Sequence, residues 1–232
     1  MELGLNGKRA LVLGASRGLG MEIAKGLARE GATVFATARN GDAIREWAAK
    51  FDGADVMPIT LDLSDIYEID AALAALMKDG GVDILINNAG GPPPGTAAAA
   101  GRPDWIKHFE TMAANLFHVT TTLLPKMRER GWGRIITIAS SGVEQPIPNL
   151  ALSNGVRAAV VGWSKTLATE VAGDGVTVNV VLPGRIHTVR VDELDAAAAK
   201  RTQKDVKDVA IASAASIPAG RYGKPEEFAD VV

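Results

Sequence analysis

The chain has 232 residues, of which 47% are hydrophobic and 22% are charged, and this ordinary composition excludes disordered, collagen-like and disulfide-scaffold proteins. The 25 Lys and Arg residues against 27 Asp and Glu residues give a net charge of −2, so no overall positive field favours a nucleic-acid partner. The absence of cysteine excludes disulfides and cysteine-ligated metal sites.

The N-terminal residues carry Glu2, Lys8 and Arg9 with no long apolar run, so we expect no secretory signal. Apolar runs elsewhere are much shorter than the roughly 20 residues of a membrane-spanning helix. We therefore expect a cytoplasmic protein without membrane contact.

Six short runs rich in β-branched residues predict buried strands at Arg9–Leu13, Thr33–Thr37, Val56–Leu61, Val82–Asn87, Arg134–Ala139 and Val176–Leu182. Segments with helical spacing of apolar residues alternate with them, at Leu19–Glu30, Asp42–Phe51, Ile66–Lys78, Trp105–Arg130 and Leu152–Ala172. This alternation predicts an α/β fold, a doubly wound parallel sheet covered by helices on both faces, in a single domain spanning residues 1–232.

Two stretches depart from the alternation. Gly90–Gly95 contains three consecutive prolines and predicts a loop beyond the carboxyl end of a strand. Thr188–Pro218 predicts one or two amphipathic helices outside the sheet, and we expect residues 188–218 to form a lid over the substrate. Pro225, followed by two acids, indicates the start of a final helix.

A glycine-rich turn follows the first predicted strand and leads directly into a helix. It contains Gly14, Ser16, Arg17, Gly18, Leu19 and Gly20. Residues without a Cβ let the backbone approach a pyrophosphate, and the N-terminus of the following helix offers free N–H groups and a positive dipole end. The turn therefore predicts a dinucleotide-binding site.

The second predicted strand ends at Ala38-Arg39-Asn40 without an acidic residue, although a fold selective for NAD usually places Asp or Glu there to bind the ribose 2′-OH. Arg39 and Arg17 can instead pair with a 2′-phosphate. The sequence favours NADP(H), although a plain surface role for either arginine remains open.

Motifs in order along the chain resemble those of the classical short-chain dehydrogenase/reductase family, in the branch similar to 3-oxoacyl-acyl-carrier-protein reductases. They comprise Gly14, Gly18 and Gly20, Asp62-Leu63, Asn87-Asn88-Ala89-Gly90, Asn115, the run Gly133–Ser140, and Pro183-Gly184. The resemblance covers essentially the whole chain and implies a Rossmann fold, although the family's final strand has no counterpart here.

The resemblance also implies residue roles. Asp62 and Leu63 would contact the adenine, Asn87, Asn88, Ala89 and Gly90 would support the adenosine side, and Ile186 and Thr188 after Pro183-Gly184 would contact the nicotinamide end. Asn115 would hold a water relay, and Ser140 would donate a hydrogen bond to the substrate carbonyl oxygen, where negative charge develops. The alternative for Ser140 is a strand-end hydroxyl bonded to its own turn.

The family's catalytic tyrosine, thirteen residues after that serine, and its lysine four residues further on are replaced by Ser153 and Arg157. The spacing keeps both side chains on one helical face. A serine hydroxyl is a much weaker acid than a phenol, and an arginine does not deprotonate, so the family mechanism cannot operate unchanged. The only tyrosines are Tyr67 and Tyr222.

Three other proton sources remain open: a water held by Ser140 and Ser153, a titrating group such as His187, or an acid on the substrate. Arg157 would either contact the nicotinamide ribose or clamp a carboxylate or phosphate of the ligand. No metal-binding motif occurs in the sequence.

These features predict an NADP(H)-dependent oxidoreductase that acts on a small carbonyl or alcohol substrate with atypical proton delivery. A non-catalytic NADP(H)-binding sensor or partner subunit, and a lyase or isomerase on the same scaffold, are the alternatives. The resemblance also implies a homodimer or homotetramer, paired through the predicted helices Trp105–Arg130 and Leu152–Ala172.

Overall fold

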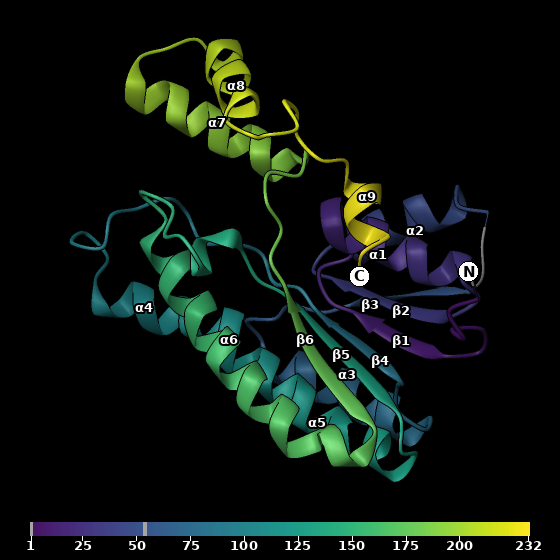
Figure 1. Cartoon of the computed structure of the whole chain (residues 1–232). Helices are drawn as coiled ribbons and strands as arrows, with labels where there is room; N and C mark the ends of the chain where they lie inside the picture. The colour runs from purple at the N-terminus through teal and green to yellow at the C-terminus, as the bar shows by residue number, and fades with distance from the viewer. Residues whose placement is uncertain (1, 53–54) are drawn as a thin grey trace.

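A six-stranded parallel sheet forms the centre of the protein. The computed structural model describes residues 2–52 and 55–232 (Figure 1). Its strands are β1 (Arg9–Val12), β2 (Thr33–Ala38), β3 (Val56–Thr60), β4 (Ile84–Asn87), β5 (Gly133–Ile138) and β6 (Val176–Val181). The strands are hydrogen-bonded in the order β3-β2-β1-β4-β5-β6, and every pairing is parallel. The predicted single-domain, doubly wound Rossmann fold is therefore confirmed.

The helices lie in two layers and one excursion. They are α1 (Gly18–Arg29), α2 (Gly41–Ala49), α3 (Ile66–Lys78), α4 (Arg102–Phe109), α5 (Asn115–Glu129), α6 (Ala151–Val171), α7 (Val189–Thr202), α8 (Val206–Ala215) and α9 (Pro225–Ala229). Figure 1 shows α1, α2 and α9 on one side of the sheet and α3, α5 and α6 on the other, with α7 and α8 standing apart.

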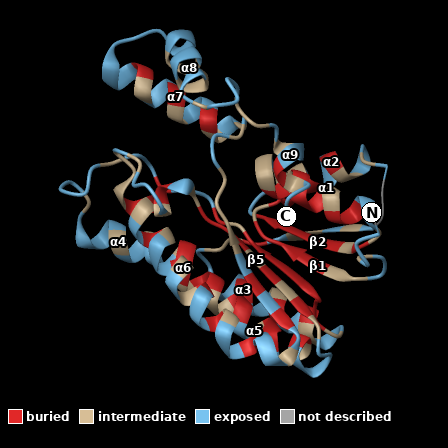
Figure 2. Ribbon diagram, viewed as in Figure 1, coloured by how far each residue is buried: buried red, intermediate tan, exposed pale blue. Residues whose placement is uncertain are grey.

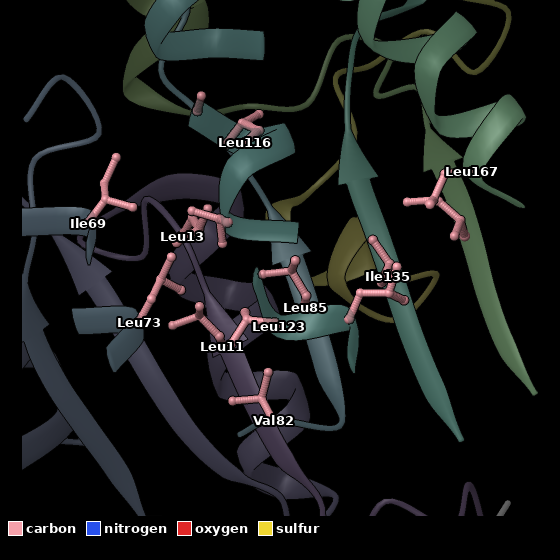
Figure 3. Close-up of a cluster of buried hydrophobic side chains, with 14 of the residues drawn as sticks. Leu11, Leu13, Ile69, Leu73, Val82, Leu85, Leu116, Leu123, Ile135 and Leu167 are labelled. Atoms are coloured by element: carbon pink, nitrogen blue, oxygen red, sulfur yellow. The ribbon is translucent and has the colours of Figure 1, made fainter. Parts of the chain in front are cut away.

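The alternation of side chains along β1 divides the core between the two faces, because successive residues of a strand point to opposite sides. Leu11 and Leu13 belong to the cluster beneath α3, α5 and α6, which Figure 3 shows, whereas Ala10 and Val12 belong to the cluster beneath α1, α2 and α9. A sheet covered on both faces needs strands that are apolar at every position.

The prediction of one continuous helix over Trp105–Arg130 is wrong. The helical segment begins earlier, at Arg102, because the Asp104 carboxylate accepts a hydrogen bond from the N–H of Gly101 (3.2 Å). It is then interrupted by a π-helical turn over Glu110–Ala114, directly before Asn115. A π-helical turn of only five residues is too short for the spacing of apolar residues to distinguish it from α-helix.

The predicted excursion contains two helices, α7 and α8, and Figure 2 shows that α8 has a largely exposed surface. Its neck is closed by a parallel bridge between Ile186 and Gly223. Hydrogen bonds from His187 N to Gly223 O (2.8 Å) and from Gly223 N to Arg185 O (2.9 Å) flank that bridge. The two chain segments that enter and leave the helix pair are thus held together at the carboxyl edge of the sheet.

Within residues 2–52 and 55–232, no helix is long and apolar enough to cross a membrane.

Candidate functional site

The turn after β1 requires glycine at two positions with left-handed backbone, Gly14 (φ 64°) and Gly18 (φ 60°). Gly20 is required for space, since a Cβ there would lie 2.3 Å from the carbonyl oxygen of Gly14. The N–H of Ala15 donates to Thr37 O (2.8 Å), which ties the turn to the end of β2. The predicted phosphate-binding turn therefore lies where adjacent parallel strands end, as in dinucleotide-binding folds.

The N-terminus of α1 has no side-chain cap. Arg17 is the N-cap residue, its side chain makes no capping hydrogen bond, and the first turn of α1 contains no acid. Ser16 and Leu19 flank this end of the helix. Uncapped N–H groups and the positive end of the helix dipole suit a pyrophosphate, so the N-terminus of α1 fits the phosphates of a dinucleotide.

Asn88 holds the glycine turn from the neighbouring strand. Its Nδ2 donates to the carbonyl oxygens of Leu13 (3.1 Å) and Gly14 (3.3 Å). Ala89 and Gly90 continue from it along the same edge. Asn87, in contrast, is buried in the core, where its Nδ2 donates to Thr120 Oγ1 (2.9 Å). The two consecutive asparagines thus play different structural parts.

Arg39 lies exposed beyond β2, near the Asp62 carboxylate that follows β3. Burial opposes ionisation of Asp62, but hydrogen bonds from the N–H and hydroxyl of Ser64, together with the charge of Arg39, lower its pKa overall. Arg17 points elsewhere, with its Nη2 3.5 Å from Glu193 Oε1 on α7. The structure does not bring Arg17 and Arg39 into contact with each other.

Asn115 begins α5 directly after the π-helical turn and is buried. Its Nδ2 donates to the carbonyl oxygen of Leu63 (2.7 Å). This bond joins the segment after β3 to the start of α5. Its role in a water relay stays a prediction.

Ser140 follows β5, and its Oγ accepts a hydrogen bond from the N–H of Gly142 (3.1 Å). The hydroxyl thus caps its own turn, as the structural alternative expected. Because Oγ serves here as an acceptor, its own hydrogen remains available for a ligand oxygen. The turn and a role in binding a carbonyl are compatible.

Ser153 and Arg157 face the ends of two strands from the N-terminal part of α6. The Nε of Arg157 donates to Ser153 Oγ (3.3 Å), Nη1 donates to Ile138 O of β5 (2.8 Å) and Nη2 donates to Ala89 O after β4 (3.3 Å). Burial, followed by the nearby charge of Arg190, lowers the pKa of Arg157 to about 10. The guanidinium therefore stays charged at neutral pH, and its acceptor Ile138 lies two residues before Ser140 in the chain.

The segment after β6 carries Pro183, Gly184, Ile186 and Thr188 along the same edge. The Pro183 carbonyl oxygen accepts from Ser141 N (3.3 Å). A Cβ built on Gly18 would lie 3.6 Å from the Thr188 methyl group. This contact places the base of α7 directly beside the glycine turn.

Both tyrosines are engaged elsewhere or exposed. The Tyr222 hydroxyl donates to Asp195 Oδ2 (2.6 Å), and burial and this bond raise the pKa of the phenol. Tyr67 is 82% exposed on α3. His187 pairs with Asp192 (3.2 Å) at the neck and is largely exposed.

A polar network at α7 was not predicted from the sequence. Arg190 donates from Nη2 to Pro92 O (2.7 Å) and pairs with Glu193 (3.3 Å), while Arg185 and Tyr222 share the buried carboxylate of Asp195. The Arg190–Glu193 spacing of three residues on a helix was a detectable signal. No local signal marks the contacts of Arg190 with Pro92 or of Tyr222 with Asp195.

Two hollows flank this edge. One of about 340 Å³ is lined by Thr96, Ala97, Trp105, Ile147, Asn149, Ala151 and Asn154. A smaller one runs beneath α7 and is lined by residues such as Leu150, Arg185 and Leu194. Within the described ranges, no group of three or more His, Asp or Glu residues is placed to hold a metal ion.

Comparisons with known proteins match this arrangement over nearly the full chain. Residues 8–199 match the sequence profile of the family described as short chain dehydrogenase. The 3-oxoacyl-acyl-carrier-protein reductases of Vibrio cholerae and Escherichia coli are 36% and 34% identical, each over 99% of this chain and 90% of the relative.

Solved structures are equally similar. The L-sorbose reductase of Gluconobacter frateurii, in complex with NADPH and L-sorbose, is 34% identical with a TM-score of 0.90, over 100% of this chain and 90% of that one. A variant of actinorhodin polyketide ketoreductase with NADPH is 35% identical with a TM-score of 0.91, over 97% of this chain and 88% of that one.

Proposed function

This chain belongs to the short-chain dehydrogenase family, and we propose that it is an NADP(H)-dependent oxidoreductase acting on the carbonyl or alcohol group of a small molecule. One structural observation supports this proposal most strongly, the proximity of the predicted cofactor-binding and catalytic residues. The glycine turn with its uncapped helix N-terminus and the Ser140–Arg157 region lie at the same carboxyl edge of the sheet. The similar reductases solved with NADPH support the cofactor assignment.

NADP(H) is favoured over NAD(H) by the charges at the end of β2. Arg39 is exposed there and no acid follows the strand, so a 2′-phosphate finds a guanidinium where a bare ribose would lack its usual carboxylate partner. Arg17 joins this interaction once it leaves Glu193.

The remaining cofactor contacts follow the order of the strands. We assign the adenine side to Asp62, Leu63, Asn88, Ala89 and Gly90, the pyrophosphate to Gly14, Ser16, Gly18, Leu19 and Gly20, and the nicotinamide side to Pro183, Gly184, Ile186 and Thr188. When bound, NADPH supplies the hydride that reaches the carbonyl carbon. We assign Asn115, which is fixed to the Leu63 carbonyl oxygen, to holding a water relay.

Ser140 positions and polarises the substrate. Its Oγ already accepts from Gly142 N, so the hydroxyl hydrogen is directed to the carbonyl oxygen. Because negative charge develops on that oxygen during reduction, a preorganised donor stabilises the transition state more than the ground state.

Proton delivery differs from that of relatives with a tyrosine. Ser153 accepts from Arg157 Nε, which leaves its own hydrogen free to donate to a water. We assign the proton to this water, held between Ser153 and Ser140. The water O–H bond breaks, an O–H bond forms on the substrate, and the hydroxide that remains takes a proton from bulk solvent. The fixed charge of Arg157 stabilises this hydroxide.

A second candidate function is non-catalytic NADP(H) binding, as a sensor or partner subunit. It is favoured by the engagement of Arg157 with three protein acceptors, which gives this arginine a structural role. Tyr222 offers no substitute acid, because its hydroxyl is bound to Asp195.

Two measurements test the proposal. Titrations with NADPH and NADH, followed by quenching of the four tryptophans, should show tighter binding of NADPH. NADPH oxidation with a panel of ketones and aldehydes should then show stoichiometric turnover. NADPH binding without turnover of any carbonyl would favour the sensor, and failure of both cofactors to bind folded protein would refute both candidates.

The assembly we propose is a homodimer or homotetramer paired through α5 and α6. Phe117 of α5 and Trp163 of α6 stack with ring centroids 4.2 Å apart, which makes the two helices one surface. Light scattering on the purified chain measures the number of copies, and a monomer at micromolar concentration would contradict this assignment.

A further inference from the structure

Among residues 2–52 and 55–232, the hydrogen bonds of Arg157 go to uncharged acceptors alone, namely the carbonyl oxygens of Ile138 and Ala89 and the hydroxyl of Ser153. A guanidinium has five N–H donors, so two of them remain for a ligand. Within the described part of the chain, no carboxylate forms an ion pair with Arg157. A charge held this way gains most from an anion that binds beside it, because a half-buried ion has lost much of its hydration.

Arg190 reaches the same segment from α7. Its Nη2 donates to Pro92 O (2.7 Å), three residues beyond the Ala89 carbonyl that Arg157 binds. A Cβ built on Gly91 would lie only 3.4 Å from that Nη2, so glycine leaves room for the guanidinium. Residues 89–92 therefore connect the two arginines, and the positive charge of Arg190 contributes to the lowered pKa of Arg157.

Around residues 89–92, positively charged side chains outnumber the carboxylates that pair with them. Glu193 has Oε2 3.3 Å from Arg190 and Oε1 3.5 Å from Arg17. The guanidiniums of Arg190 and Arg17 thus share one carboxylate, whose two contacts are both long for charge-assisted hydrogen bonds. The neighbouring Arg185 is already paired with Asp195 (3.0 Å). Together with Arg157, which binds only uncharged acceptors among the described residues, these groups give this edge of the site an excess of positive charge.

We propose that the substrate is a carbonyl compound that carries a carboxylate, which lies between Arg157 and Arg190 while the carbonyl oxygen faces Ser140. This inference rests on the proposed function and adds the class of substrate. Arg157 is suited to this position, because its Nη1 is fixed to Ile138, two residues before Ser140. Arg190 closes on the carboxylate from α7, so substrate binding draws that helix towards the sheet.

The phosphates of the cofactor have the same anionic chemistry, so the test must separate the two sources. Arg190→Gln removes the charge on α7 and retains hydrogen-bonding capacity. Lys200→Gln removes an equal charge from an exposed position on the same helix and serves as the control. Glu193→Gln removes the competing carboxylate.

The probes are 3-oxobutanoate and its uncharged methyl ester, titrated calorimetrically with and without NADP⁺. The wild-type protein should bind the acid more tightly than the ester. Arg190→Gln should weaken binding of the acid about 10- to 100-fold without affecting binding of the ester. Glu193→Gln should strengthen binding of the acid. Lys200→Gln should leave the affinities for acid and ester unchanged.

Equal affinities for acid and ester in the wild-type protein would overturn the proposal. So would an Arg190→Gln variant that loses NADPH affinity but keeps the wild-type ratio of acid to ester binding, since Arg190 would then serve the cofactor phosphates. A separate NADPH titration reports on the proposed function itself. Should NADPH fail to bind, the acid and ester titrations without cofactor still decide whether the carboxylate site exists.

Discussion

The Nε of Arg157 donates a hydrogen bond to Oγ of Ser153, 3.3 Å away and one helical turn earlier on α6. In this pair the positive charge lies beside a hydroxyl that is a poor acid. The pair supplies a positive charge and hydrogen-bonding groups, but it does not contain a side chain that readily gives up a proton at neutral pH.

Restoring an acidic side chain should therefore raise activity. The double substitution Ser153→Tyr with Arg157→Lys should increase the kcat for reduction of simple ketones about 10²- to 10⁴-fold, the usual contribution of a positioned general acid. Each single substitution is the matched control, and NADPH oxidation is the readout. An unchanged rate in a double variant that binds NADPH normally would count against a reductase site.

Arg39 should determine the preference for the phosphorylated cofactor. Arg39→Gln should weaken NADPH about tenfold or more, the cost of a charge-assisted hydrogen bond, and leave NADH affinity unchanged. Arg29→Gln, at the opposite end of α1, is the control for loss of one positive charge. Equal weakening of both cofactors would show that Arg39 does not read the 2′-phosphate.

Two glycine substitutions should have opposite effects on stability. Gly20→Ala places a Cβ 2.3 Å from Gly14 O, so the turn must shift, and both Tm and NADPH affinity should fall. Gly162→Ala fills open space inside α6 and should stabilise the fold by about 0.5–1 kcal/mol. Thermal unfolding of the two variants measures both effects, and a Gly20→Ala variant with wild-type Tm would contradict the crowding.

Packing of α9 against α1 should weaken at acid pH. Arg221 donates two hydrogen bonds to Glu227 (2.8 and 2.7 Å), and these hold the pKa of Glu227 to about 2, well below its ordinary value of 4.5. A carboxyl whose pKa is lower in the folded state contributes stability above its unfolded pKa and loses it as pH falls. The contribution should therefore disappear between about pH 5 and pH 2.

Hydrogen exchange of the α9 amides measures this dependence. Wild-type α9 should lose protection across that range, whereas Glu227→Gln should show lower protection at pH 6 and little further change. Because Glu227 also accepts from the N–H of Lys224 (2.8 Å), the effect should centre on the first turn of α9. Identical pH profiles for both proteins would exclude Glu227 as the titrating group.

The order of strands and helices could be predicted because each element is specified by a pattern of residue types over a short stretch of sequence. The apolar run Arg9–Leu13 and the glycines that follow it specify a strand, a turn and a helix within about twenty residues. The glycine-rich turn, for which we predict phosphate binding, was recognisable for the same reason. The break before Asn115 was not, because a π-helical turn of five residues is too short for apolar spacing to reveal it.

The sequence by itself determined the fold class and the family, since both rest on residue type and local spacing, and it predicts that Ser153 and Arg157 replace the tyrosine and lysine of the family. Only the tertiary structure decided what Arg157 and Arg190 touch. Their carbonyl partners Ala89 and Pro92 lie 68 and 98 residues away along the chain. Parallel strands joined by helices bring such distant residues to one edge, and no local pattern records which of them will meet.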